Sequence, residues 1–282
     1  MVMATSNEPD AVGPVPFKDI AGAVPLTTVS GYPSDPKLWQ SFTPRRGDVV
    51  LASPPKCGTT WLKALAFATM ARGVYPPVDA EPHPLVRLNP HDCVPFMEML
   101  FAAGQGRSKM DALPSPRLMA THMHHSILPA SIKDNADCKI IYICREPKDM
   151  VVSLWHFARR TQPDLLFSDT GPIWDHVLGY WNASKASPET VLFLRYDEML
   201  RDPVGNVKKA ARFVGQPFSP AEEEAGVVMD VVRLCSFETL RNLEINRAGE
   251  VGDWASYMTP DMARRLDAVV DEKLRGSGLS FA

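Results

Sequence analysis

Residues 53–61 combine the groups that proteins use to bind a phosphate: Ser-Pro-Pro-Lys-Cys-Gly-Thr-Thr-Trp. They follow an apolar, β-branched run and precede residues with helical spacing. We therefore expect a helix N-terminus, whose unpaired N–H groups and dipole favour an anion. Gly58 lets the backbone approach closely, Thr59 and Thr60 add hydroxyl donors, and Lys56 adds a charge. A tight strand-to-helix turn with an incidental lysine is the simpler alternative.

The order of these residues argues against a nucleotide-triphosphatase loop. That loop reads GxxxxGK[ST], with the lysine after the second glycine, whereas Lys56 precedes Gly58. A nucleotide kinase would also need an aspartate at the end of a neighbouring strand, and the apolar run CKIIYICR ends in Arg145.

Arg145 is the second candidate for binding an anion. It ends the apolar run 138–145, and Ser153 follows eight residues later in a segment predicted to be helical. A guanidinium at a strand end and a hydroxyl on the next helix can converge on one dianion. The alternative is a weak surface ion pair between Arg145 and either Glu146 or Asp149.

His122 lies in RLMATHMHHSILP and is a candidate base, because a neutral imidazole near its ordinary pKa can accept a proton from a hydroxyl. With His124 and His125 it could instead suggest a zinc site. No cysteine or carboxylate stands at ligand spacing in this stretch, which disfavours zinc.

These segments together resemble the cytosolic sulfotransferases. PKCGTTW is similar to their PKSGTTW loop, with Cys57 in place of the usual serine, and the R-x7-S pair and Gly252-Asp253-Trp254 follow in the family's order. The resemblance runs from about Trp39 to the C-terminus. ATH, CSFETLRNLEIN and GEVGDW make it closest to the plant-type members.

The resemblance implies an enzyme that transfers the sulfuryl group of phosphoadenosine phosphosulfate (PAPS) to a hydroxyl and releases phosphoadenosine phosphate, without a metal. His122 would be the catalytic base, Lys56 would stabilise the leaving oxygen, and Phe96 and Phe157 would line an apolar acceptor pocket. Phenols, flavonoids, steroids and hydroxylated hormones all remain candidate acceptors. The implied donor-binding residues are Lys56, Cys57, Gly58, Thr59, Thr60, Trp61, Arg145, Ser153, Tyr196, Ser236, Phe237, Arg247, Ala248 and Gly249.

Within that set, Arg145 and Ser153 would bind the 3′-phosphate of the donor, with Arg247 and Gly249 closing over it. Trp61 and Phe237 would stack on the adenine.

The chain departs from the family before Gly252. Ala248 replaces a familiar lysine, and the loop before Gly252-Asp253-Trp254 is shorter than in plant-type members, which makes the alignment of Arg247 ambiguous. The alternative function is therefore a protein that binds PAPS or another nucleotide with little or no turnover.

Strands are predicted at 48–53, 117–122, 138–145 and 191–196, with Tyr196 closing the last, and helices follow them. Helices are also expected from Ser219 and from Thr259, and one short helix at 96–101. This alternation predicts a single α/β domain: a central parallel sheet flanked by helices, with a phosphate loop resembling that of nucleotide kinases. We expect a flexible arm at 1–36 and the sulfotransferase domain at 37–282.

The composition limits the kinds of partner and compartment that we expect. The 282 residues carry a net charge of -3, which disfavours a nucleic-acid binder. We find no signal peptide and no apolar run long enough to span a membrane, and the odd number of cysteines, five, fits a reducing compartment. A cytoplasmic protein with a small-molecule partner is expected. Residues 255–264 retain only Thr259 of the dimer motif of animal members, which favours a monomer.

Overall fold

The computed structural model describes residues 42–78, 83–102, 106–161, 172–236, 239 and 251–281. Its centre is a parallel four-stranded sheet in the order β2-β1-β3-β4. The strands are β1 (Val49–Ala52), β2 (Leu118–Thr121), β3 (Lys139–Cys144) and β4 (Val191–Arg195). The predicted α/β class and parallel sheet are confirmed.

Alternate residues of each strand enter two separate apolar cores, as the two-residue period of a strand requires. Val49 and Leu51 of β1 face the first core, whereas Val50 and Ala52 face the second. Ile141 of β3 faces the first core in the same way. Both faces are covered by helices, so these strands are apolar throughout rather than alternating.

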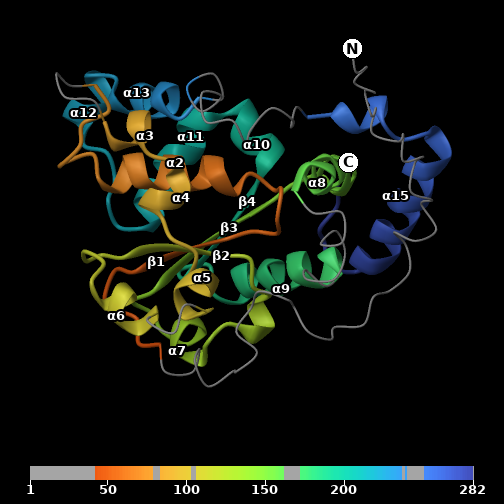
Figure 1. The fold of residues 1–282 in the computed structure, drawn as a ribbon, viewed down its shortest axis with the longest axis horizontal. Coiled ribbons are helices and arrows are strands. Elements are labelled where there is room, and N and C mark those ends of the chain that lie inside the picture. Colours follow the sequence, from red (N-terminus) through yellow and green to blue (C-terminus); the bar gives the residue numbers. More distant parts are fainter. Residues whose placement is uncertain are drawn as a thin grey trace, which may run out of the picture.

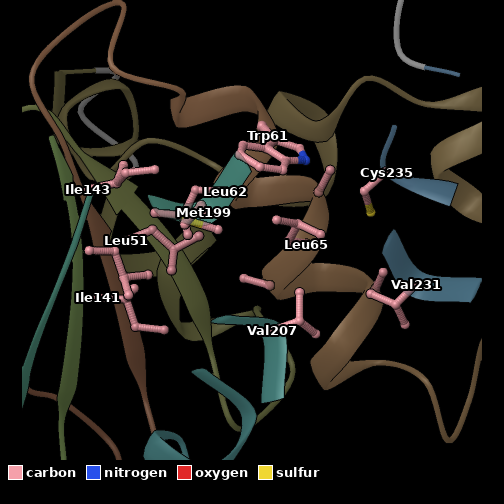
Figure 2. Packing of buried hydrophobic residues seen from close by; sticks show 14 of the residues in the cluster. Leu51, Trp61, Leu62, Leu65, Ile141, Ile143, Met199, Val207, Val231 and Cys235 are labelled. Carbon is pink, nitrogen blue, oxygen red and sulfur yellow. The ribbon is translucent and has the colours of Figure 1, made fainter. Parts of the chain in front are cut away.

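The first core lies under α2 (Thr59–Met70), α11 (Pro203–Phe213) and α13 (Val227–Leu234), which cover one face of the sheet (Figure 1). Figure 2 shows Leu51 and Ile141 of the sheet facing Leu62 and Leu65 of α2. The second core lies under α9 (Ile173–Ala186) and α15 (Pro260–Leu274). The sheet therefore lies between two layers of helices.

The remaining helices are short, apart from α8 (Pro147–Thr161), which follows β3. They are α3 (Pro84–Arg87), α4 (Pro90–Cys93), α5 (Met97–Ala102), α6 (Gly106–Asp111), η2 (His125–Ile127), α7 (Ala130–Lys133), α10 (Tyr196–Arg201), α12 (Pro220–Glu224) and η4 (Asp253–Ser256). Within the described residues, no helix has the length and apolarity to cross a membrane.

Helix-terminus signals in the sequence are confirmed. Ser219 and Glu222 form the predicted capping box of α12, and the Thr259 hydroxyl accepts from the Met262 N–H at the start of α15. Gly215 has φ +75° just after α11, and its N–H and that of Gln216 bond to carbonyls of the last turn.

Three predictions differ from the structure. Tyr196 does not close the fourth strand: β4 ends at Arg195 and Tyr196 is the first residue of α10, because the following residues form a helical turn. The other strands are also one residue shorter at each end than predicted. The connection from 75 to 116 holds α3, α4 and α6 in addition to the expected α5, the first two beginning at proline. The expected arm, 1–36, lies outside the described residues, and the domain boundary stays a prediction.

Candidate functional site

The predicted site residues gather at the carboxyl edge of the sheet. The loop 53–58 follows β1, His122 follows β2, Arg145 follows β3 and Tyr196 follows β4. In an open parallel sheet this edge is where ligands bind, next to the strand at which the strand order reverses. The residues that follow the four strands are therefore brought to one edge because the strands run parallel.

The loop after β1 has a conformation that only certain residues tolerate. Lys56 has φ +65° and Gly58 has φ +93°, both in the left-handed region. A Cβ on Gly58 would lie 2.6 Å from Cδ2 of Tyr196. Glycine is thus required twice, for its backbone angle and for the closeness of the Tyr196 ring.

Gly58 is also the N-cap of α2, whose first turn begins Thr59-Thr60-Trp61. The N–H groups of that first turn lack carbonyl partners within the helix, and the helix dipole adds partial positive charge. The Lys56 side chain belongs to this loop, and the Thr59 and Thr60 hydroxyls belong to the first turn of α2. This set of donors has the chemistry that a phosphate or sulfate group needs, and its role in binding stays a prediction.

Cys57 is buried in the loop, and burial raises the pKa of its thiol to about 12; a hydrogen bond to the Arg145 backbone and the Arg145 and Lys56 charges oppose that shift. The thiol therefore stays protonated at neutral pH and is no nucleophile. Ser53, at the start of the loop, shares a 2.7 Å hydrogen bond with the Thr59 hydroxyl.

The imidazole of His122 is held by one of its nitrogens. Nδ1 lies 2.8 Å from the carbonyl oxygen of Ser53, an acceptor, so Nδ1 carries the proton and donates it. Nε2 is then the unprotonated nitrogen that can accept a proton. Burial lowers the pKa of His122 to about 4; the Ser53 hydrogen bond opposes this shift, and the nearby Lys63, His91 and Lys56 side chains add to it.

The backbone of His122 is fixed on both sides. Its N–H donates to Oε1 of Glu98, which also accepts from the Thr121 hydroxyl at 2.7 Å. Its carbonyl accepts from Nε2 of His176 at 3.1 Å, and Nδ1 of His176 lies 3.1 Å from the Tyr142 hydroxyl. Burial lowers the pKa of His176 to about 3, so this ring is neutral and its Nδ1 accepts from the tyrosine.

Arg145 and Ser153 are both buried, Arg145 directly after β3 and Ser153 in the second turn of α8. Arg145 does pair with Asp149, at 3.6 Å, but with both side chains buried rather than at the surface. The Asp149 carboxylate also accepts from the N–H groups of Gly252 (3.0 Å) and Trp254 (3.3 Å). Asp149 thus joins Arg145 to the Gly252-Asp253-Trp254 turn.

Some of the predicted aromatic residues lie in the first core, and others lie beside His122 or Lys56. Trp61 is buried in the first core and meets the Tyr196 ring edge-on, with centroids 5.6 Å apart. The Arg145 guanidinium lies 4.9 Å from the same Tyr196 ring, and burial raises the pKa of Tyr196 to about 12. The centroid of the Phe96 ring lies 4.7 Å from the centroid of the His122 ring.

The ring of Phe157, 40% exposed, has its centroid 4.5 Å from Nζ of Lys56. The two residues predicted to line the acceptor pocket, Phe96 and Phe157, thus lie beside His122 and Lys56 respectively. Ser236 follows α13, and its hydroxyl bonds with that of Thr239 at 3.0 Å. Phe237, Arg247, Ala248 and Gly249 lie outside the described residues, as does the shortened loop.

Five functional candidates were not singled out from the sequence: Lys63, His91, Glu98, Asp149 and His176. A lysine inside the apolar helical segment TTWLKALAFA was the clearest signal available. Within the described residues, no three His, Cys, Asp or Glu side chains are grouped to hold a metal, and His122, His124 and His125 are no exception.

Comparison with known proteins gives one consistent result. The sulfotransferase domain model matches residues 46–278. Cytosolic sulfotransferase 5 of Arabidopsis thaliana is 42% identical over 273 residues, covering 86% of this chain and 84% of the relative. Flavonol 3-sulfotransferase of Flaveria bidentis is 41% identical over 274 residues, covering 85% and 86%.

Solved structures agree with this result. The crystal structure of mouse sulfotransferase SULT7A1 complexed with PAP superposes with a TM-score of 0.66 at 28% identity, covering 87% of this chain and 91% of that one. An Arabidopsis thaliana protein provisionally assigned as a steroid sulphotransferase gives a TM-score of 0.69 at 38% identity, covering 87% and 82%.

Proposed function

This chain belongs to the plant-type cytosolic sulfotransferase family, and on that premise we propose that it sulfates a hydroxyl of a small, largely apolar acceptor with His122 as the base. Family membership makes it a PAPS-dependent sulfotransferase. The identity of the base, the donor contacts and the acceptor class are the proposal. We propose a cytoplasmic location, because relatives are named cytosolic.

The donor site is proposed at the loop 53–58 and the N-terminus of α2. Bound PAPS supplies an electrophilic sulfur and a phosphate leaving group. Lys56 would neutralise charge on the oxygen between them, while the first-turn amides with Thr59 and Thr60 hold the other oxygens. This is catalysis by positioning and electrostatics, as in phosphoryl transfer.

At the far end of the donor, Arg145 and Ser153 are proposed to bind the 3′-phosphate. Both side chains are buried, and Arg145 stands at the carboxyl end of β3, where a dianion would be shielded from solvent. Arg145 lies beside Asp149, so a bound phosphate would compete with that carboxylate for the guanidinium.

The observation that carries the proposal is the hydrogen bond from Nδ1 of His122 to the Ser53 carbonyl. It leaves Nε2 as a proton acceptor next to the loop that would hold the donor. With a pKa of about 4 the ring is neutral at physiological pH. The imidazolium formed on accepting the acceptor's proton would be stabilised by the negative charge of the bound donor.

The same low pKa supports a phenolic acceptor. A weak base removes a proton more readily from a phenol, whose pKa is about 10, than from an aliphatic alcohol. The rings of Phe96 and Phe157 would suit a flat aromatic acceptor. A relative that is 41% identical carries the name flavonol 3-sulfotransferase, which makes flavonols the first acceptors to test. A role in plant secondary metabolism or hormone modification would follow.

The test is to incubate the purified protein with PAPS and flavonols, simple phenols, hydroxysteroids and aliphatic alcohols, and to detect sulfated products by mass. We expect phenolic products, and His122→Gln should lower kcat by roughly 10² to 10⁴ fold. His125→Gln is the matched control, since His125 is a partly exposed histidine three residues further on.

Binding of phosphoadenosine phosphate should be the same in all three proteins. Binding without any sulfated product would favour the alternative, a nucleotide-binding protein with little turnover. Full activity in His122→Gln would exclude His122 as the base.

A further inference from the structure

Lys63 is a lysine with no exposed surface on α2, one turn after Thr60. Its Nζ lies 3.0 Å from Nδ1 of His91 and 3.2 Å from the centroid of the Phe96 ring. The other nitrogen of the same imidazole, Nε2 of His91, lies 3.2 Å from the Thr60 hydroxyl. Lys63, His91 and Thr60 therefore form a chain of hydrogen bonds that ends on the phosphate loop.

Elementary hydrogen-bond chemistry fixes the direction of this chain. A lysine ammonium has only donors, so Nδ1 of His91 must accept. Burial lowers the pKa of His91 to about 4, with the Lys63 charge acting in the same direction, so the ring is neutral and carries its single proton on Nε2. Nε2 then donates to the Thr60 oxygen, and the Thr60 hydroxyl proton points away from His91.

We propose that Lys63 and His91 are positioning residues that orient the Thr60 hydroxyl to donate its hydrogen bond to the anionic group of the sulfuryl donor. The inference rests on the proposed donor site at the N-terminus of α2. Without the ammonium, the imidazole can carry its proton on either nitrogen, and the hydroxyl is as free to donate towards His91 as towards the ligand. While Lys63 is charged, this Lys63–His91–Thr60 chain of hydrogen bonds, the relay, removes that choice.

The charges around Lys63 make the relay responsive to the ligand. Burial lowers the pKa of Lys63 to about 7, opposed by the carboxylates of Glu98 on α5 and Asp92 on α4. The neutral rings of His91 and His122 and the Lys56 charge also face this cluster. An anion bound at the start of α2 would favour the charged form of Lys63, so binding should be accompanied by proton uptake.

The experiment measures the Kd of phosphoadenosine phosphate by calorimetry for the wild type, Lys63→Met, Thr60→Val and the double variant. Methionine keeps the length and apolar contacts of lysine without its donors. We expect each single variant to weaken binding about tenfold to a hundredfold, the loss of one hydrogen bond to a charged group. If Lys63 acts through Thr60, the double variant binds no more weakly than Thr60→Val alone. Additive losses would overturn the proposal.

Two further measurements test the relay, and the first does not use Lys63→Met. Glutamine at position 91 can accept with its oxygen and donate with its nitrogen, so His91→Gln should retain affinity that His91→Leu loses; equal losses would contradict the relay. At about pH 8, one unit above the pKa of Lys63, proton uptake on binding should occur in the wild type and not in Lys63→Met. A wild type that does not bind phosphoadenosine phosphate would refute the donor site itself, whereas binding with equal proton uptake in both proteins would refute only the relay.

Discussion

Replacing Gly58 by alanine tests whether the loop conformation is required by the backbone or by the neighbouring ring. The backbone angle, φ +93°, costs a residue with a Cβ about 1–2 kcal/mol. The new Cβ would also lie 2.6 and 2.8 Å from two ring atoms of Tyr196. That ring is buried between Trp61 and Arg145, so it has little room to move, and overpacking of this kind costs about 1–3 kcal/mol.

Gly215→Ala is the matched control for Gly58→Ala. Gly215 has φ +75°, and a Cβ there would meet nothing within 4 Å, so it measures the backbone cost alone. Urea unfolding should give a loss of roughly 2–5 kcal/mol for Gly58→Ala and about 1–2 kcal/mol for Gly215→Ala. Only Gly58→Ala should weaken binding of phosphoadenosine phosphate. If Gly58→Ala is no less stable than Gly215→Ala and binds the ligand normally, the proposed closeness of loop and ring is wrong.

Three further outcomes are expected. Arg145→Lys should weaken phosphoadenosine phosphate about tenfold or more but leave adenosine 5′-monophosphate unaffected, since only the former has a 3′-phosphate; equal losses in titrations of the two would contradict that assignment. The pKa of His176, about 3 in the folded protein against an ordinary 6.5, means that its contribution to stability is complete above pH 6.5 and is lost as pH falls. Between pH 7 and pH 5 the free energy of unfolding should therefore drop about 2 kcal/mol less in His176→Gln than in the wild type, measured by urea unfolding. Turnover should persist in EDTA, because Lys56 rather than a metal is proposed to neutralise the leaving oxygen; loss of activity restored by Mg²⁺ would refute this.

Local signals in the sequence were sufficient to predict the strands and the residues that follow them at the site. The apolar runs that became β1 and β3 are buried on both faces, as expected for strands of a parallel sheet covered by helices on both sides. Because parallel strands end at one edge, the residues that follow them had to meet. The loop, His122 and Arg145 were predictable for this reason.

The groups that support those residues were not predictable, because each depends on contacts between distant segments. Asp149 was expected at most to form a surface ion pair, yet it accepts hydrogen bonds from backbone more than 100 residues away, at Gly252. Tyr196 was placed in a strand because it directly follows VLFLR, whereas it begins α10 and its ring lies against Gly58. The position of Lys63 inside an apolar helical segment was a signal, but its partner, His91 of α4, lies 28 residues away and is brought to it only by the fold.

The fixed position of His122 has a consequence for which hydroxyl is modified. Its ring is held through Nδ1 and its backbone through Glu98 and His176, so the imidazole cannot turn to follow an acceptor. If His122 is the base, as proposed, a polyhydroxylated acceptor would have to bring one particular oxygen to Nε2. Regioselectivity would then be determined by how the acceptor lies against Phe96 and Phe157, and changes at those two rings should redirect sulfation to another hydroxyl of the same molecule.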